Sequence, residues 1–251
     1  MSFLNGRNVF TAFMVFLLVG PIFIIRAAGC LLAITWLFLA RIPPTPPSAK
    51  GQAPWHNIVE GFNFLKNNKI FISIIALYLL TMLTATTTSS FIPVFARDIL
   101  GVGAVGYGYL QAAPGAGAVI ALLLLSFFTY YKRKTKLQAI FGIIMGICLI
   151  IFSMSSWLYF SLLLLIVFGG MQIGFTSLNT AVIQNAVTDN IRGRIMSWRE
   201  IAFGLGPVVS ILFGAIAQRT SVSVSLGLLG VISLIVSFLL IAFLSRFKKV
   251  E

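Results

Sequence analysis

Long apolar runs recur along this chain, and they limit what it can fold into more than any other feature does. From residue 70 onward, six runs are bounded by charged or turn-forming residues, at about 70–95, 105–129, 138–156, 158–183, 198–218 and 222–244. An α-helix rises about 1.5 Å per residue, so roughly 20 apolar residues cross the hydrocarbon core of a bilayer. Each run is therefore predicted to be a transmembrane helix.

Composition identifies the solvent and the class of fold. Hydrophobic residues make up 59% of the chain and charged residues 9%, whereas soluble domains carry about 25% charged residues. The chain therefore lacks the polar surface of a soluble protein and is expected to contact the lipid bilayer. Backbone groups in lipid must bond internally, and the runs lack the period of two that barrel strands show. We predict an all-α fold, a polytopic transmembrane helical bundle.

The N-terminal part is less regular. Residues 9–25 and 27–40 are apolar but are separated only by Arg26, so they form either a tight hairpin or one helix beside an irregular stretch. The prolines that follow, up to Pro54, forbid a regular helix, and the residues after them could form a short interfacial helix. The predicted organisation is an N-terminal stretch over 1–42, a cytoplasmic linker over 43–69 and a six-helix transmembrane bundle over 70–247.

The net charge of +13 comes from basic residues that lie between the apolar runs. They form no basic and aromatic motif on a soluble domain, so no nucleic-acid partner is expected. Lysines and arginines instead gather in the cytoplasmic loops of membrane proteins. Fourteen of the eighteen fall on one side of the predicted bundle: Arg41, Lys50, Lys66, Lys69, Lys132, Arg133, Lys134, Lys136, Arg192, Arg194, Arg199, Arg246, Lys248 and Lys249.

The remaining basic residues complete the topology. Arg97 and Arg219 fall on the opposite side, and Arg7 and Arg26 lie in the N-terminal stretch. The linker and the C-terminus are therefore predicted to be cytoplasmic, in a multi-pass protein of the cell membrane. The start of the chain lacks a short apolar core followed by a small-residue cleavage site, so no cleavable signal peptide is expected.

The segment after the fourth run, QNAVTDNIRGRIMSWRE, gathers charges of both signs at the cytoplasmic edge of the fourth and fifth spans. Ion pairs at such a seam can hold one conformation closed and break in another, which predicts a conformational gate. Its candidate residues are Asp189, Arg192, Gly193, Arg194 and Glu200. The alternative is that these basic residues only anchor the cytoplasmic loop.

The fifth run contains FGLGPVVSILFGAIAQ, in which small residues and a proline occur together. Glycines allow helices to approach closely, and proline cannot donate the usual helical hydrogen bond. Gly204, Gly206, Pro207 and Gly214 are therefore predicted to serve helix packing and bending.

Polar residues are sparse within the runs, and each needs a partner or a water-filled cavity. Those that share helical faces are candidates for lining a substrate cavity: Thr81, Thr84 and Thr88 in the first run, Gln111 in the second, and Gln172, Thr176, Asn179 and Thr180 in the fourth. The threonines could instead bond to the backbone of their own helix. The sequence leaves both readings open.

Catalytic constellations are missing. The five acidic residues, Glu60, Asp98, Asp189, Glu200 and Glu251, all lie away from the middle of a predicted span, and His56 is the only histidine. No paired carboxylates, zinc motif or phosphate-binding loop can be assembled. Cys30 and Cys148 lie inside apolar runs and are read as small hydrophobic side chains. We therefore expect no enzyme activity, no cofactor, no metal site and no disulfide.

Three segments carry a resemblance to a known family: FIPVFARDILGVGAVGYGYLQAAPGAGAVIA, IQNAVTDNIRGRIMSW and GLGPVVSILFGAIA. Together they resemble the major facilitator superfamily, and within it the enterobactin-exporter-like branch of transmembrane secretion effectors. The resemblance implies a twelve-helix fold in two six-helix halves, with residues 70–247 as the second half and residues 1–42 as a remnant of the first. It also implies secondary, ion-gradient-driven export of a small molecule such as a siderophore or a drug.

The implied partners are a small-molecule substrate and either a second copy of the chain or a complementary half that closes the cavity. The alternative function is a non-transporting membrane fragment or a scaffold that pairs with another chain. Transport by this chain alone is not expected, because one wall of the cavity would be missing. We also expect no carboxylate among the polar faces to carry a proton at membrane depth.

Overall fold

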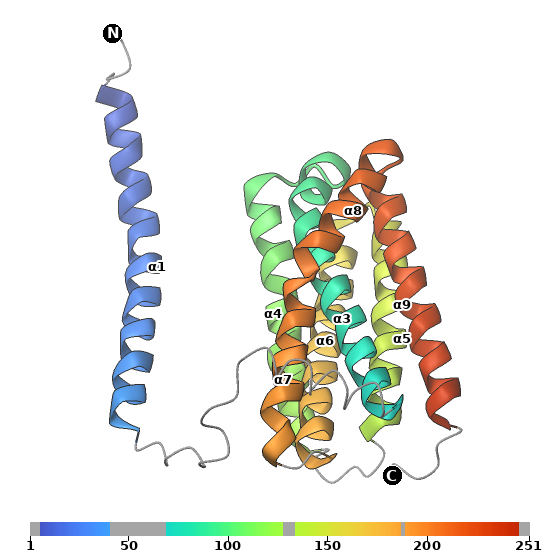
Figure 1. Ribbon diagram of the computed structural model, residues 1–251. Coiled ribbons are helices and arrows are strands. Elements are labelled where there is room, and N and C mark those ends of the chain that lie inside the picture. Colours follow the sequence, from blue (N-terminus) through green and yellow to red (C-terminus); the bar gives the residue numbers. More distant parts are fainter. Residues whose placement is uncertain (1–5, 41–68, 128–133, 187–188, 246–251) are drawn as a thin grey trace. The chain divides into compact units, whose positions relative to one another are not determined.

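The computed structural model describes residues 6–40, 69–127, 134–186 and 189–245 (Figure 1). These residues form helices without any strand, which confirms the predicted all-α class. In chain order the helices are α1 (Gly6–Leu39), α3 (Lys69–Val94), the π-helix η2 (Phe95–Ile99), α4 (Gly103–Phe127), α5 (Lys134–Ser153), α6 (Leu158–Ala186), α7 (Asp189–Gly204), α8 (Gly206–Arg219) and α9 (Val222–Ser245). The chain divides into two compact units, Met1–Gln52 and Ala53–Glu251.

Five stretches of the described residues are long and apolar enough to cross a membrane. The stretches long and apolar enough are Ile75–Ile99, Gly103–Ser126, Leu158–Gln184, Ile195–Arg219 and Val222–Leu239. Helix α5 contributes a shorter apolar stretch, Leu137–Ser153. A polytopic membrane bundle is therefore the architecture of this chain.

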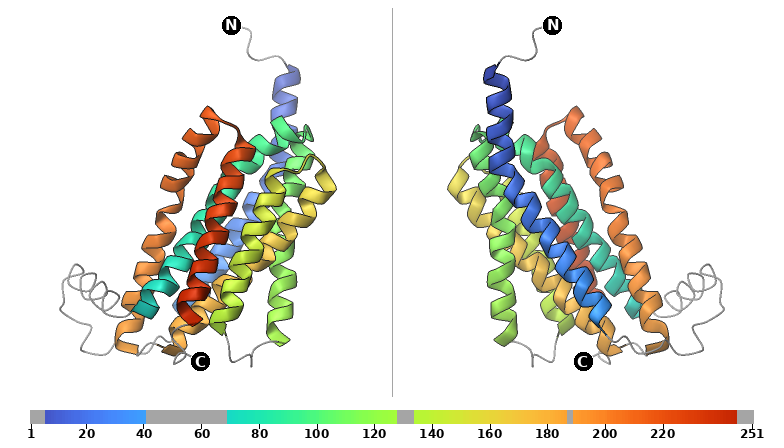
Figure 2. Two further views of the ribbon diagram at one scale, coloured as in Figure 1. Left: turned by 90° about the vertical axis from the view of Figure 1, so that its right-hand side faces the viewer. Right: turned by 90° about the vertical axis from the view of Figure 1, so that its left-hand side faces the viewer.

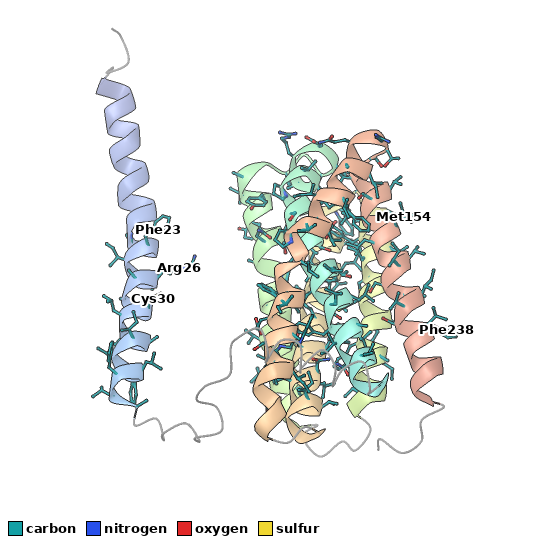
Figure 3. All side chains as sticks on the ribbon, in the orientation of Figure 1. Phe23, Arg26, Cys30, Met154 and Phe238 are labelled. Atoms are coloured by element: carbon teal, nitrogen blue, oxygen red, sulfur yellow. The ribbon has the colours of Figure 1, made fainter. Side chains whose placement is uncertain are left out.

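Helix α1 is one continuous helix of 34 residues that passes through Arg26, so the tight hairpin is wrong. A single arginine between two apolar runs does not supply turn chemistry, because its long side chain can extend from a helix toward water while the backbone stays helical. Phe23, Arg26 and Cys30 all project from this helix (Figure 3), and Phe23 is 66% exposed within the structure.

In the larger unit the helices run up and down alternately (Figure 1 and Figure 2). The starts of α3, α5 and α7 and the ends of α4, α6 and α9 lie at one end of the bundle, and η2 and the α8–α9 turn lie at the other. Its outer surface is apolar. Met154 and Phe238 project away from the bundle, with 81% and 62% of their surface exposed (Figure 3). Such side chains suit contact with lipid.

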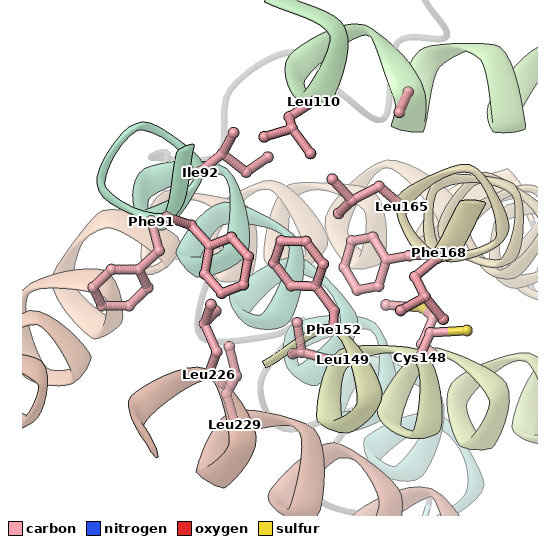
Figure 4. Close-up of a cluster of buried hydrophobic side chains, with 14 of the residues drawn as sticks. Phe91, Ile92, Leu110, Cys148, Leu149, Phe152, Leu165, Phe168, Leu226 and Leu229 are labelled. Carbon is pink, nitrogen blue, oxygen red and sulfur yellow. The ribbon is translucent and has the colours of Figure 1, made fainter. Parts of the chain in front are cut away.

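A buried apolar cluster joins η2 and helices α3, α4, α5, α6 and α9 (Figure 4). At its centre Phe95 stacks on Phe152 with ring centroids 4.4 Å apart. Leu110 and Leu226 close the cluster from α4 and α9, and both are fully buried. In lipid, where apolar surface is not driven together by water, this dense packing is what holds the helices to one another.

Glycines set how closely the helices approach. A Cβ on Gly117 of α4 would overlap the carbonyl oxygen of Ile166 on α6, and one on Gly169 of α6 would overlap Pro114 of α4. Helices α5 and α9 meet in the same way, since a Cβ on Gly146 would lie 2.9 Å from the carbonyl oxygen of Gly230. Side chains at these positions would push the helix backbones apart.

We expected a loop after the fourth run. Instead, residues 189–204 form helix α7. An aspartate and an asparagine at the first two positions favour a helix start, since a negative charge stabilises the positive end of the helix dipole. The fifth span is also divided: α7 ends at Gly204 and α8 begins at Gly206. Pro207 lies in the first turn of α8, where its missing N–H costs no helical hydrogen bond.

Candidate functional site

A cavity of about 410 Å³ lies between α3, α4, α6 and α7. Its lining combines bulky apolar, small and polar side chains: Tyr78 and Met82 from α3, Pro114, Gly115 and Ala118 from α4, Gly169, Gln172, Ile173 and Thr176 from α6, and Arg199, Glu200 and Phe203 from α7. Concave, mostly apolar sites with a few polar groups are typical of small-molecule binding.

Small residues explain why space remains at this place. Helices α4 and α6 approach closely at Gly117 and Gly169, and next to this contact α4 presents only Pro114, Gly115 and Ala118 to the cavity. A Cβ on Gly115 would meet no other atom within 4 Å. The two helices are therefore tightly packed at one level, and the cavity lies beside that contact.

Arg199 provides a cationic group in the cavity. Its side chain is 17% exposed, and Nη1 donates a hydrogen bond to Thr180 Oγ1 at 2.6 Å. The guanidinium carbon lies 5.0 Å from the centre of the Tyr78 ring, which is within the range of a cation–π interaction. Nη2 lies 3.3 Å from Glu200 Oε1, and Nε is buried without a hydrogen-bond partner.

The polar face of α6 supports this arginine through a series of hydroxyl groups. Thr180 donates to the carbonyl oxygen of Thr176 at 2.9 Å, and Thr176 donates to that of Gln172 at 2.8 Å. Because the Thr180 hydroxyl gives its proton to the backbone, its oxygen is oriented to accept from Arg199. Asn179 is fully buried on the same helix.

Of the residues predicted to line a cavity, Gln172 and Thr176 do so here. Thr81, Thr84 and Thr88 are buried in α3 and donate to the carbonyl oxygens of Leu77, Leu80 and Thr84, at 2.9, 2.7 and 2.7 Å. These hydroxyls therefore bond to the backbone of their own helix, which was the alternative to lining a cavity. Gln111 is exposed, and its Nε2 lies 3.3 Å from the Tyr107 hydroxyl.

Of the predicted gate, Glu200 lines the cavity, with a side chain that is 64% exposed. Gly193 is exposed on α7, and a Cβ there would meet no atom within 4 Å. The side chains of Asp189, Arg192 and Arg194 lie outside the described residues, although their backbones belong to α7. The gate stays a prediction.

Of the residues predicted to serve packing and bending, Gly206 is buried, and a Cβ there would lie 2.7 Å from Thr86 Oγ1. Pro207 follows it at the start of α8. Gly204 and Gly214 have open space, since a Cβ at either position would meet nothing within 4 Å.

The structure bears on two expectations about the charged residues. Arg199, which also falls within the predicted run 198–218, lies in α7, inside the candidate span Ile195–Arg219. No carboxylate was expected among the polar faces, but Glu200 lines the same cavity as Gln172 and Thr176, so this expectation is wrong. Because α7 begins at Asp189, residues expected at the edge of a span belong to a longer helix.

Sequence reasoning missed Tyr78 and Arg199 as site residues. The adjacent Arg199 and Glu200 could have indicated a site, because charged residues inside a transmembrane stretch are costly and are often functional. Nothing in the sequence distinguishes Tyr78 from the other aromatic residues of the apolar runs. Among the described residues no three His, Cys, Asp or Glu side chains are grouped as metal ligands, and Cys30 and Cys148 are free thiols.

Comparison with known proteins gives one family match. A family model described as transmembrane secretion effector matches residues 11–251, which is nearly the whole chain and includes most of α1. No curated protein matches the sequence.

Proposed function

Because this chain belongs to the transmembrane secretion effector family of the major facilitator superfamily, we propose that it exports a small molecule and uses an ion gradient as its energy source. Membrane transport is the activity of the superfamily. Export of a small molecule requires that the described bundle offers a place for a substrate.

The cavity between α3, α4, α6 and α7 is the observation that supports this proposal. Its volume of about 410 Å³ suits a small organic molecule. The lining residues Gln172 and Thr176 lie near the middle of α6, so a bound molecule would sit deep within the bundle. Secondary transporters bind their substrates at such a depth and open the site alternately to each side of the membrane.

A second wall would complete the site. Helices α4 and α8 carry exposed apolar side chains, among them Tyr109, Val119, Ile211 and Leu212. We propose that lipid covers part of this surface and that a complementary half or a second copy of the chain covers the rest. The scaffold alternative shares this surface but does not require a bound small molecule.

The orientation of the chain is testable. We predict that the linker around Lys50, the loop between α4 and α5 and the C-terminus are cytoplasmic, because basic residues concentrate there. In intact cells, cysteines replacing Lys134 and Lys249 are expected to stay unlabelled by an impermeant thiol reagent and to react after lysis. A cysteine replacing Arg219 is the matched control and should react in intact cells. The reverse pattern would invert the topology.

The gate is a second prediction. Replacement of both Arg192 and Arg194 by glutamine is expected to leave insertion intact and to reduce export about tenfold, because the ion pairs that close one conformation are lost. Membrane protein and export are measured in the same cells, with Arg219→Gln as the control. If the double variant no longer accumulates in the membrane, the basic residues act as topological anchors.

Export itself is tested in cells of the source organism. Cells that lack the chain are expected to retain more hydrophobic dye or siderophore-like compound than complemented cells, and an uncoupler should remove the difference. The purified 251-residue chain in vesicles with a pH gradient is expected to bind such compounds without concentrating them, because we propose that a second wall is needed to complete the site. Equal retention in both strains would favour the scaffold, and uncoupler-sensitive accumulation by the purified chain would refute the need for a second wall.

A further inference from the structure

The guanidinium of Arg199 is a fixed cation whose charge is not neutralised by its closest partner. Nη1 is bound to a hydroxyl, Thr180 Oγ1, at 2.6 Å. That hydroxyl is itself oriented by its bond to the Thr176 carbonyl oxygen at 2.9 Å. The Tyr78 ring covers the guanidinium at 5.0 Å but carries no formal charge. These contacts position the cation and leave its positive charge in the cavity.

The other donors of Arg199 are poorly paired. Nη2 reaches Glu200 Oε1 at 3.3 Å, which is longer than the 2.7–2.9 Å typical of a charge-assisted hydrogen bond. The side chain of Glu200 is 64% exposed, so few protein atoms position this carboxylate and it holds the arginine weakly. Nε is buried and has no hydrogen-bond partner. A cation that is mostly removed from water and weakly paired gains much from an additional anion.

The remaining lining indicates what kind of anion fits. The cavity of about 410 Å³ is larger than a small inorganic ion needs. Met82, Ile173 and Phe203 give it apolar walls, and Tyr78 adds an aromatic face beside the guanidinium. An apolar or aromatic body can pack against these side chains while an acidic group reaches Arg199.

Glu200 also lines the cavity, and its negative charge would favour a cationic ligand instead. A cationic ligand would pair with Glu200, but this carboxylate is 64% exposed, so few protein atoms position it. Arg199 is 17% exposed and is held by Thr180 and Tyr78, so pairing it with a ligand costs little further desolvation. The balance favours an anion, with Glu200 as the counterion that the ligand displaces.

We propose that this cavity selects organic anions, in which a carboxylate or a similar acidic group binds Nη2 of Arg199 and an apolar or aromatic body lies against Tyr78, Met82 and Phe203. The proposal rests on the transport function proposed above, because the anion is the substrate of that function. Glu200 pairs with Arg199 in the structure and leaves this position when the ligand binds.

The test compares three probes of one shape and different charge: 1-naphthoate, 1-naphthamide and 1-naphthylmethylammonium. Calorimetry on the full chain in lipid nanodiscs measures their affinities. The unmodified chain is expected to bind naphthoate at least about tenfold more tightly than the amide, because only the anion forms charge-assisted bonds. Arg199→Gln should abolish this preference, Arg199→Lys should keep part of it, and Glu200→Gln should raise the affinity for naphthoate. Arg219→Gln, at the far end of α8, is the matched control and should behave as the unmodified chain.

The comparison of acid and amide on the unmodified chain needs no variant, so misfolding of Arg199→Gln would not obscure it. Equal affinities for the two, or a preference for the ammonium probe that Glu200→Gln removes, would overturn the anion proposal. Export of the probes from cells is measured separately. Export of all three without charge preference would refute the anion proposal and leave the transport function standing. Arg199-dependent binding of naphthoate without export of any probe would support the anion site and refute the transport function.

Discussion

Gly117→Leu is expected to lower the amount of folded protein in the membrane about tenfold. Even a Cβ at this position would overlap the Ile166 carbonyl oxygen and lie 2.9 Å from the Gly170 backbone nitrogen. These are backbone atoms of α6, which cannot rotate away as a side chain can. Overpacking of a dense interior costs about 1–3 kcal/mol and occasionally more, and losses of about 1–2 kcal/mol already change cellular abundance several-fold.

Gly108→Leu is the matched control, because it makes the same substitution on the same helix. A Cβ at Gly108 would meet no other atom within 4 Å, so the variant is expected to accumulate as the unmodified chain does. The measurement is the amount of monodisperse protein extracted from membranes, together with its midpoint of thermal unfolding. Equal yields and midpoints for the two variants would show that the α4–α6 contact is looser than described.

Gly115→Phe is expected to reduce export more than tenfold while the amount of membrane protein stays unchanged. Gly115 lines the cavity, and a Cβ there would meet nothing within 4 Å, so the added ring has space to enter without displacing a helix. A ring in that space removes volume from a site of about 410 Å³ and competes with the substrate for the apolar wall. Loss of only about 1.4 kcal/mol of binding free energy corresponds to tenfold weaker affinity.

Gly108→Phe separates filling of the cavity from a general effect of a new aromatic residue in α4. It places the same side chain in open space outside the cavity lining, and its export is expected to match that of the unmodified chain. The readout is export of a dye normalised to membrane protein. Full export by Gly115→Phe would mean that the substrate does not use this cavity.

The helices could be predicted from the sequence because a bilayer demands a minimum apolar length. The runs at 105–129, 158–183 and 222–244 correspond to α4, α6 and α9 within a few residues at each end. The start of α7 was missed, since its first residues are polar and lie outside the apolar run. Helical hydrogen bonding does not stop where the apolar sequence stops, so the charged first turns of α7 read as a loop.

The cavity could be predicted in part. The spacing of Gln172 and Thr176 places them on one face of a helix, and both reach the cavity. The threonines of α3 have the same spacing, but their hydroxyls bond to their own backbone, and spacing alone does not separate these outcomes. Arg199 and Tyr78 meet across two helices that are far apart in the sequence. Such a pair depends on tertiary packing, which no local pattern encodes.

The backbone bonds of the α3 threonines bear on how this helix can move. Thr81, Thr84 and Thr88 each satisfy their hydroxyl within α3, so a shift of α3 along a neighbouring helix breaks none of these three bonds. The bond between Thr87 and Ser210 at 3.2 Å instead crosses to α8. On the face of α3 that carries these three threonines, sliding breaks none of their hydrogen bonds, whereas on the side of α8 the Thr87–Ser210 bond links the two helices. A shear of α3 that keeps the Thr87–Ser210 bond would change the position of Tyr78 relative to Arg199 at little cost in hydrogen bonding.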